Sequence, residues 1–461
     1  MSMKNIKIVP FLALALFLAP ACEKDLELNP SQSLSTGEAL SDVASLKTAL
    51  NGAYDALQVV GYYGRGFLVL PETEANLAYL SIANSNRYVA SYTFQWTAQN
   101  GDVTNIWDNG YAAILRANNV INNADGVPGD AAEKNQVKGE ALAIRALVHF
   151  DLVRFFAKQY TNGTPSTDLG VPIILTAGIG EPARNTVAEV YDQVIADLTA
   201  AKALLRNNGA YRFSPEAVEA LLARVYLYKG DWAKAETAAS TLIGDSQYAL
   251  SGNVSAMFGG PGSSEEILTL KNEASENRGS DNLGNIYIPA GYGDIRVTDD
   301  LRNLYEAGDS RATLIFKHTN NQYYNGKYME QDGVVGLTSP KLIRLAEMYL
   351  IRAEARFRQT KTVDALADIN TLRLKRGATE LMSLANGFMD ILHERQRELA
   401  FEGHTAFDYW RTNTDMVRTQ CGTGLEVSAP CSMSATSNLT VHPIPQTEMD
   451  VNQNMEQNEG Y

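Results

Sequence analysis

The sequence predicts a mainly α-helical protein, in which a scaffold of helical hairpins is interrupted by long irregular loops with few short strands. Apolar residues recur at i, i+3 and i+4 spacing through most of the chain, which is typical of amphipathic helices. Between residues 246 and 340 this spacing is lost, and Gly, Asn, Ser and Tyr become frequent. We therefore expect one domain over residues 37–461. Its helical scaffold occupies about 37–245 and 341–411, its irregular insertion about 246–340, and a C-terminal loop segment 412–461.

Two long helices are predicted first. Residues 104–125 carry apolar side chains on one face, and residues 140–157 are apolar on almost every side, so the second helix should be central and nearly enclosed. Thr186 and Glu189 have the spacing of a capping box at the start of the next helix. Ser214 followed by Pro215 has the pattern of a cap and a first helical residue.

The helix after Pro215 ends at Gly230-Asp231, and a partner helix begins at Trp232. With Ala and Tyr at its packing positions, this hairpin resembles a tetratricopeptide unit. A degenerate second copy lies at residues 346–370. No strict period is maintained, so we expect a tetratricopeptide-like scaffold with large insertions and not a regular solenoid.

The N-terminus predicts export. Lys4 and Lys7 precede a short apolar run, and Ala21 stands directly before Cys22. This pattern is typical of a secretory signal peptide at residues 1–21, and the run is too short to span a bilayer. Residues 22–36 read as a polar tether. A soluble secreted protein with an incidental Cys22 is the alternative.

The composition excludes several classes of function. With 39 Lys and Arg against 53 Asp and Glu, the formal net charge is −14, which argues against a nucleic-acid partner. Five His and three Cys predict no metal site, no cofactor and no disulfide scaffold. Cys421 and Cys431 lie close together in a Gly- and Ser-rich segment, and they either close a small disulfide loop or remain free thiols.

No catalytic motif is complete. His393-Glu394 opens like a zinc-protease motif, but Arg397 stands where the second His is required. The charges around it are typical of ion pairs along a helix. Glu72 and Glu74 could be compared with a glycosidase carboxylate pair, although two surface carboxylates are the simpler interpretation. The sequence contains no nucleophile elbow, Walker or dinucleotide motif.

Aromatic residues gather in two loop regions, which makes these loops candidate ligand platforms. A flat ring can stack on the C–H face of a sugar while neighbouring amides and hydroxyls bind its polar rim. The alternative for any single ring is that it anchors its loop to the core. The candidate ligand-binding residues are Arg87, Tyr88, Tyr92 and Trp96 in the first region, and Tyr287, Tyr292, Tyr323 and Tyr324 in the second.

Several motifs follow one another in a characteristic order along the chain: Cys22 with the 25–30 segment, 106–118, 139–154, 222–232, 344–355, 370–377, 394–408, 443–445 and 457–461. Together they resemble the SusD/RagB family of nutrient-binding outer-membrane lipoproteins of Bacteroidetes. No single motif is decisive, but their number and order make the resemblance specific.

The resemblance implies a SusD-like fold and a role in nutrient uptake. Cys22 would be acylated, and the protein would be anchored in the outer membrane and exposed at the cell surface. It would capture an oligosaccharide, or a peptide in the RagB branch, and deliver it to a SusC-like TonB-dependent transporter. It would not be an enzyme. A glycoside hydrolase and a tetratricopeptide scaffold for envelope assembly are the alternatives.

Overall fold

The structure is a computed structural model that describes residues 39–422 and 424–461. The predicted signal peptide, Cys22 and the tether lie outside these residues. None of the helices in the described ranges combines the length and the apolar composition needed to cross a membrane.

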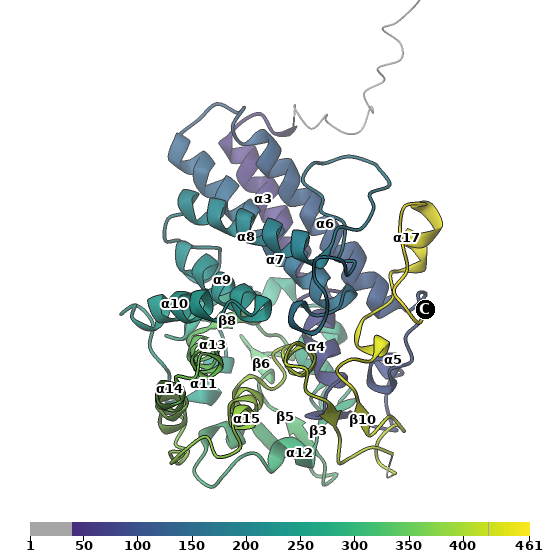
Figure 1. Ribbon diagram of the computed structural model, residues 1–461, viewed down its shortest axis with the longest axis vertical. Helices are drawn as coiled ribbons and strands as arrows, with labels where there is room; N and C mark the ends of the chain where they lie inside the picture. The colour runs from purple at the N-terminus through teal and green to yellow at the C-terminus, as the bar shows by residue number, and fades with distance from the viewer. Residues whose placement is uncertain (1–38, 423) are drawn as a thin grey trace, which may run out of the picture.

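Four long helices form one end of the molecule (Figure 1). They are α3 (Val43–Gln58), α6 (Gly101–Asn123), α7 (Ala131–Phe156) and α8 (Val187–Leu204). Helix α7 packs against the other three, and most of its residues are buried. This confirms the prediction of a central, enclosed helix. It begins earlier than the apolar run at 140, because Asp130 caps it by accepting a hydrogen bond from the backbone of Glu133 at 2.9 Å.

The predicted caps are present. The Thr186 side chain accepts a hydrogen bond from the backbone of Glu189, and the Glu189 carboxylate accepts one from the backbone of Thr186, so the capping box of α8 is closed in both directions. The Ser214 side chain caps α9 (Pro215–Lys229), with Pro215 as its first residue.

Two helical hairpins continue the scaffold. The first joins α9 to α10 (Trp232–Ile243) through Gly230, whose φ of 77° suits glycine, and Asp231, which caps α10. The second joins α13 (Leu345–Arg358) to α14 (Thr362–Lys375), and α13 packs against α10 (Figure 1). The fold is therefore mainly α and tetratricopeptide-like, as the sequence predicts.

The irregular part is built from short elements. Among the described residues, every strand belongs to a two-stranded antiparallel pair. The pairs are β1 (Ala78–Leu80) with β3 (Ile295–Val297), β2 (Glu266–Thr269) with β8 (Lys341–Arg344), β4 (Ile315–Lys317) with β5 (Tyr323–Asn325), β6 (Glu330–Gln331) with β7 (Val334–Val335), and β9 (Met416–Val417) with β10 (Ser432–Met433).

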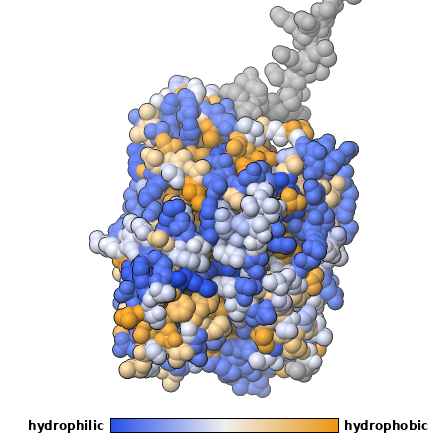
Figure 2. Space-filling view, in the orientation of Figure 1, coloured by the Kyte–Doolittle hydropathy of each residue, from blue (hydrophilic) through white to orange (hydrophobic). Residues whose placement is uncertain are grey.

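The remaining helices are short and connect these parts. They are α4 (Gly66–Thr73), α5 (Val89–Thr93), α11 (Val254–Phe258), α12 (Asp299–Arg302), α15 (Phe388–Leu399), α16 (Thr405–Arg411) and α17 (Gln446–Val451). Figure 2 shows hydrophilic residues interspersed with smaller apolar areas over one face of the molecule.

A buried ion network surrounds α15. Glu398 accepts hydrogen bonds from Arg311, Arg344 and Arg376, and all four side chains are at most 2% exposed. The charged residues that follow His393 are therefore structural, as their spacing predicts. Within the two described ranges, no group of three or more His, Cys, Asp or Glu side chains is placed to hold a metal ion.

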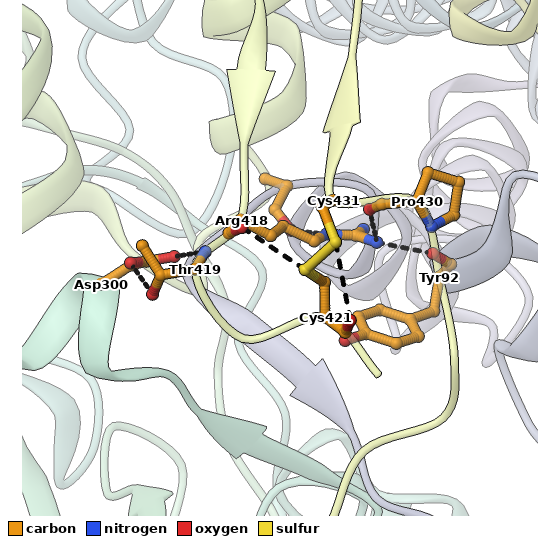
Figure 3. Close-up of a disulfide and its surroundings, with 8 residues drawn as sticks. Tyr92, Asp300, Arg418, Thr419, Cys421, Pro430 and Cys431 are labelled. Carbon is orange, nitrogen blue, oxygen red and sulfur yellow. Dashed lines mark hydrogen bonds between the residues drawn. A yellow bond between two sulfur atoms is a disulfide. The ribbon is translucent and has the colours of Figure 1, made fainter. Parts of the chain in front are cut away.

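Cys421 and Cys431 are joined by a disulfide (Figure 3). Beside it, the buried Arg418 side chain donates hydrogen bonds to the carbonyl oxygens of Tyr92 and Pro430. The loop that the disulfide closes also lies against β1, because the backbone of Val427 donates to the carbonyl of Leu80 at 2.8 Å. The C-terminal loop segment thus supports the first aromatic region.

Candidate ligand-binding surface

The structure separates the eight candidate ligand-binding residues into two groups. Tyr88, Tyr92, Trp96, Tyr287 and Tyr324 lie in the interior and are at most 5% exposed. Arg87, Tyr292 and Tyr323 are half-buried and reach the surface. A ring without an exposed face cannot stack on a sugar in this conformation, so the second group is the better candidate.

The interior rings of the first region hold their loop on the core. The Tyr88 hydroxyl accepts a hydrogen bond from Arg65 Nε at 3.0 Å, and burial raises the pKa of Tyr88 to about 12. The guanidinium of Arg418 lies 4.3 Å from the centre of the Tyr92 ring. Trp96 packs edge-on against the imidazole ring of His442 at 4.4 Å. These contacts match the anchoring alternative.

The interior rings of the second region likewise hold their loops on the core. Tyr287 packs edge-on against Phe401 with 5.3 Å between ring centres. Tyr324 stacks on Phe316 at 5.8 Å, and its hydroxyl accepts a hydrogen bond from Asn320 at 2.7 Å. Both rings support the loops that carry the half-exposed residues.

Arg87 and Tyr292 form a pair that joins the two aromatic regions. The Arg87 guanidinium lies 4.1 Å from the centre of the Tyr292 ring, and its Nη2 donates a hydrogen bond to the Tyr292 hydroxyl at 3.0 Å. Arg87 follows β1 and Tyr292 precedes β3. Since β1 and β3 pair antiparallel, with Leu80 opposite Ile295, their loops emerge at the same end of the pair.

Asp294 fixes the two loops to each other. Its buried carboxylate accepts hydrogen bonds from the backbone and from the hydroxyl of Ser85, and its backbone carbonyl accepts one from the backbone of Ser81 at 2.9 Å. Asp294 is thus a positioning residue for Arg87 and Tyr292. No local pattern in the sequence distinguishes Asp294 from a surface aspartate, because its partner Ser85 lies in another loop.

Tyr292 lines a surface hollow of about 500 Å³, which we call the Tyr292 hollow. Its other walls are small residues, two asparagines and two valines: Asn277, Gly279, Ser280, Asn285, Ala290, Gly291, Val334 and Val335. Since Arg87 occupies one face of the Tyr292 ring, the rest of the ring is available to the hollow.

Asn285 organises this hollow. Its Nδ2 donates to the carbonyl of Gly279 at 2.7 Å, and its carbonyl accepts from the backbone of Tyr292 at 2.6 Å. A Cβ at Gly291 would lie 2.5 Å from the Asn285 carbonyl oxygen, and one at Gly336 would lie 2.6 Å from Asn285 Oδ1. Glycine at these two positions therefore lets the loops approach closely.

Opposite charges lie beside the pair. Arg65 forms an ion pair with Asp281 at 2.8 Å. Burial raises the pKa of the Asp102 carboxyl, and the positive charges of Arg65 and Arg87 oppose that rise. Arg87 makes no ion pair with a carboxylate in the described residues, so its guanidinium can offer further hydrogen bonds to a ligand.

Tyr323 lies on the β4–β5 hairpin. The Arg302 guanidinium covers one face of its ring at 3.4 Å, and Arg302 is in turn paired with Asp299. Tyr323 does not line the Tyr292 hollow, and it remains a separate candidate.

The interpretation of Glu72 and Glu74 as surface carboxylates is wrong. Glu72 is fully buried and accepts hydrogen bonds from the backbone of Phe401, Gly403 and His404. Glu74 is 2% exposed, and its carboxylate lies 3.0 Å from His442 Nε2. Glu72 thus fixes the loop that follows α15, Glu74 contacts the C-terminal segment, and both carboxylates are engaged within the fold.

Two protein-family models match the sequence of this chain. A family model described as starch-binding proteins that associate with the outer membrane matches residues 26–227. A model of the SusD family matches residues 300–461. The two ranges together cover most of the chain.

Individual proteins similar to this chain carry SusD names. SusD-like protein P2 of Formosa agariphila is 27% identical over the whole length of both chains. The starch-binding protein SusD of Bacteroides thetaiotaomicron is 36% identical over 130 residues, which are 27% of this chain and 22% of that protein.

Solved structures show the same fold. A SusD superfamily protein of Bacteroides vulgatus has a TM-score of 0.84 at 29% identity, and the match covers 91% of this chain and 99% of that one. One of Bacteroides thetaiotaomicron has a TM-score of 0.83 at 26% identity, with 90% and 99% covered.

Proposed function

Because this chain belongs to the SusD/RagB family, we propose that it is a cell-surface lipoprotein that captures oligosaccharides and delivers them to a SusC-like TonB-dependent transporter. The pairing of Arg87 with Tyr292 at the edge of the Tyr292 hollow is the observation that carries the binding part of this proposal. It joins the two loop regions in which the sequence predicts a ligand platform.

The chemistry of the hollow suits a sugar chain. A sugar ring has an apolar C–H face and a polar rim, and the Tyr292 ring stands beside the amides of Asn277 and Asn285. Gly279 and Gly291 carry no side chain, so these two positions of the lining place no bulk in the hollow. The volume of about 500 Å³ lies within the range of about 300–1,000 Å³ that is usual for small-ligand sites.

We further propose that binding occurs without chemical conversion of the ligand. The hollow presents a ring, amides and a guanidinium, and these groups support recognition by stacking and hydrogen bonds. The two carboxylates that could have suggested hydrolysis are engaged elsewhere in the fold.

The membrane anchor and the transporter complete the proposal. Acylation of Cys22 would attach the protein to the outer membrane, and more than one acyl chain gives a stable anchor. The 22–36 tether would let the folded domain cover a transporter barrel. The outer-membrane association of the matched family supports this location.

The binding proposal is tested by isothermal titration of the purified mature protein with a panel of oligosaccharides, chosen from hits on a glycan array. We expect binding to at least one glycan, and we expect Tyr292→Ala to weaken it roughly 5- to 150-fold. Loss of the stacked ring costs about 0.5–1.5 kcal/mol, and loss of a hydrogen bond costs about 0.5–1.5 kcal/mol more. Tyr211→Ala, which removes a partly exposed loop tyrosine elsewhere, is the matched control.

Three results would contradict the proposal in different ways. Glycan binding that survives Tyr292→Ala would move the site away from the hollow. Binding of peptides and not of glycans would favour the RagB-like function. Conversion of an oligosaccharide by the purified protein would favour the glycoside hydrolase.

The transporter proposal has its own test. The cognate TonB-dependent transporter is expected to co-purify with the acylated protein from outer membranes, and this complex should survive Tyr292→Ala. A protein that binds glycans but never co-purifies with such a transporter would limit the function to surface capture.

A further inference from the structure

A second pocket lies between the 158–168 segment, which follows α7, and the 435–441 segment near the C-terminus, and we call it the polar pocket. It has a volume of about 220 Å³ and shares no lining residue with the Tyr292 hollow. Every lining residue except Gly163, Ala435 and Val441 carries a polar side chain. This composition differs from that of an ordinary ligand site, which is mostly apolar.

The walls of the polar pocket are fixed by hydrogen bonds within the protein. Asn162 Nδ2 donates to the carbonyl of Ala435 at 2.9 Å and so joins the two segments. The Thr440 hydroxyl donates to the carbonyl of Ser437 at 2.8 Å and shapes the second wall. The pocket is therefore present before any ligand arrives, which lowers the entropic cost of binding.

Several polar groups in the walls remain available. The side-chain amide of Asn438 makes no hydrogen bond to any described residue. Lys158 Nζ likewise donates no hydrogen bond to a described residue, because its 3.9 Å contact with Asp168 is longer than a hydrogen bond. The walls therefore offer the donors of Lys158 and both the donors and the acceptor of Asn438 to a ligand.

The charges in the pocket balance. Lys158 Nζ lies 3.9 Å from Asp168 Oδ1, and these are the only charged residues among the lining residues. The ammonium group repels a metal cation from the carboxylate, and the carboxylate repels an anion from the ammonium group. A neutral ligand that both donates and accepts hydrogen bonds fits this arrangement.

We propose that the polar pocket binds one neutral monosaccharide unit. A sugar hydroxyl donates to one wall group and accepts from another, which matches the alternating amides, hydroxyls and paired charges of the lining. Since no aromatic residue lines the pocket and its volume is below the usual range for larger ligands, it takes one ring and not a stacked chain. This site is independent of the proposed glycan site at Tyr292.

Saturation-transfer difference NMR tests this proposal on the purified mature protein. The probes are D-glucose, D-galactose, D-mannose and D-xylose, each titrated separately, with glycine and calcium chloride as ligands of other classes. The pocket variant combines Lys158→Met with Asn438→Ala, because neither side chain holds the fold: Lys158 is exposed and the Asn438 amide is unbonded. The matched control combines Lys375→Met with Asn303→Ala at exposed positions.

We expect at least one sugar to bind the wild-type protein, and we expect the pocket variant to weaken it at least fivefold while the control changes it less than twofold. Tyr292→Ala should leave monosaccharide binding unchanged, so a failure here is distinguishable from a failure at the hollow. The proposal is overturned if no sugar binds, if the pocket variant binds sugars as the wild type does, or if only glycine or Ca²⁺ gives a response that the pocket variant abolishes.

Discussion

Arg87 and Tyr292 are separated by 205 positions in the sequence, yet the Arg87 guanidinium covers the Tyr292 ring at 4.1 Å. The contact depends on the β1–β3 pair and on the bond between Ser85 and Asp294, which bring two loops to one edge. The Tyr292 ring is therefore held in a fixed orientation before a ligand arrives. Removal of its hydroxyl alone can then be compared with removal of the whole ring.

Tyr292→Phe removes the hydroxyl that accepts from Arg87 and keeps the ring. This bond within the protein contributes about 0.5–1.5 kcal/mol to the fixed orientation of the ring, so its loss should lower glycan affinity by at most roughly 2- to 12-fold, less than Tyr292→Ala. Isothermal titration of both variants with the same glycan measures the difference. Arg87→Ala should give a loss of similar size, whereas Arg206→Ala at an exposed position should give none. Equal losses for Tyr292→Phe and Tyr292→Ala would show that stacking contributes nothing.

Gly291→Ala should distort the Tyr292 hollow. The new Cβ would lie 2.5 Å from the backbone carbonyl oxygen of Asn285, which cannot move without shifting the loop that holds Tyr292. We expect a loss of about 1–3 kcal/mol in the free energy of unfolding and weaker glycan binding. Gly252→Ala is the control, because nothing lies within 4 Å of its Cβ. Urea unfolding measures the stability of both variants, and isothermal titration measures their glycan affinity. Wild-type stability and affinity in Gly291→Ala would show that the loop adapts.

Local signals in the sequence predicted local structure correctly. The capping box of Thr186 and Glu189 and the turn at Gly230-Asp231 depend on neighbouring residues, so their outcome is set within one or two turns of helix. Whether a side chain is buried depends on residues that are distant in the sequence. Glu72 receives hydrogen bonds from residues more than 300 positions away, and no pattern around it could distinguish this role from that of a surface carboxylate.

Dependence on distant residues also explains why some candidate ligand residues are buried and others reach the surface. Tyr88 stands next to Arg87 in the sequence, but Tyr88 packs inward on Arg65 while Arg87 reaches Tyr292. The sequence predicts two aromatic loops as the ligand platform, but it could not separate the exposed side chains from the anchors. The role of Asp294 could not be predicted because it depends on Ser85 in the other loop.

The disulfide should stabilise the C-terminal loop segment. Cys421 and Cys431 enclose a loop with a sequence separation of 10, for which the chain-entropy model gives about 2–3 kcal/mol. Cys421→Ser combined with Cys431→Ser should lower the free energy of unfolding by up to that amount. Backbone amide exchange should also quicken in the loop and at Ile82, whose backbone donates to the carbonyl of Leu425. Wild-type protein treated with a reductant should behave like the double variant; unchanged stability and exchange would contradict the prediction.

Glu398→Gln should be severely destabilising. Its buried carboxylate compensates the guanidinium groups of Arg311, Arg344 and Arg376, and removal of one partner from a buried ion network costs about 3–5 kcal/mol. Urea unfolding of the variant checks the size of the loss. Glu380→Gln, at an exposed position, is the matched control. A loss below about 1 kcal/mol would mean that the arginines find other partners.

Stability should fall as the pH decreases from 7 to 5, before most carboxylates titrate. Burial lowers the pKa of His149 to about 3, and burial with nearby arginines lowers the pKa of His404 well below its usual value. Both remain neutral in the folded protein, while the unfolded chain binds protons below about pH 6.5. The unfolded state then binds more protons, so acid favours unfolding, by about 2 kcal/mol for each histidine at pH 5.

Below about pH 4.5 a further loss is expected. Burial alone would raise the pKa of Glu394 and Glu402, but neighbouring arginines, and Lys327 beside Glu402, outweigh it and lower both pKa values, so their stabilisation disappears as they are protonated. Glu72 opposes this loss, since burial raises its pKa and its protonation costs the folded state less.

Urea unfolding at pH 7, 6 and 5 measures how steeply the free energy of unfolding changes with pH, and this slope gives the contribution of the histidines. His149→Gln should reduce the loss between pH 7 and 5 by about 2 kcal/mol whatever its own stability, because Gln does not titrate. The contrast is Asn303→Ala, at an exposed position, which removes no titratable group and should leave the slope unchanged. A wild-type protein whose free energy of unfolding stays constant from pH 7 to 5 would show that His149 and His404 gain protons without unfolding, and that water reaches both rings.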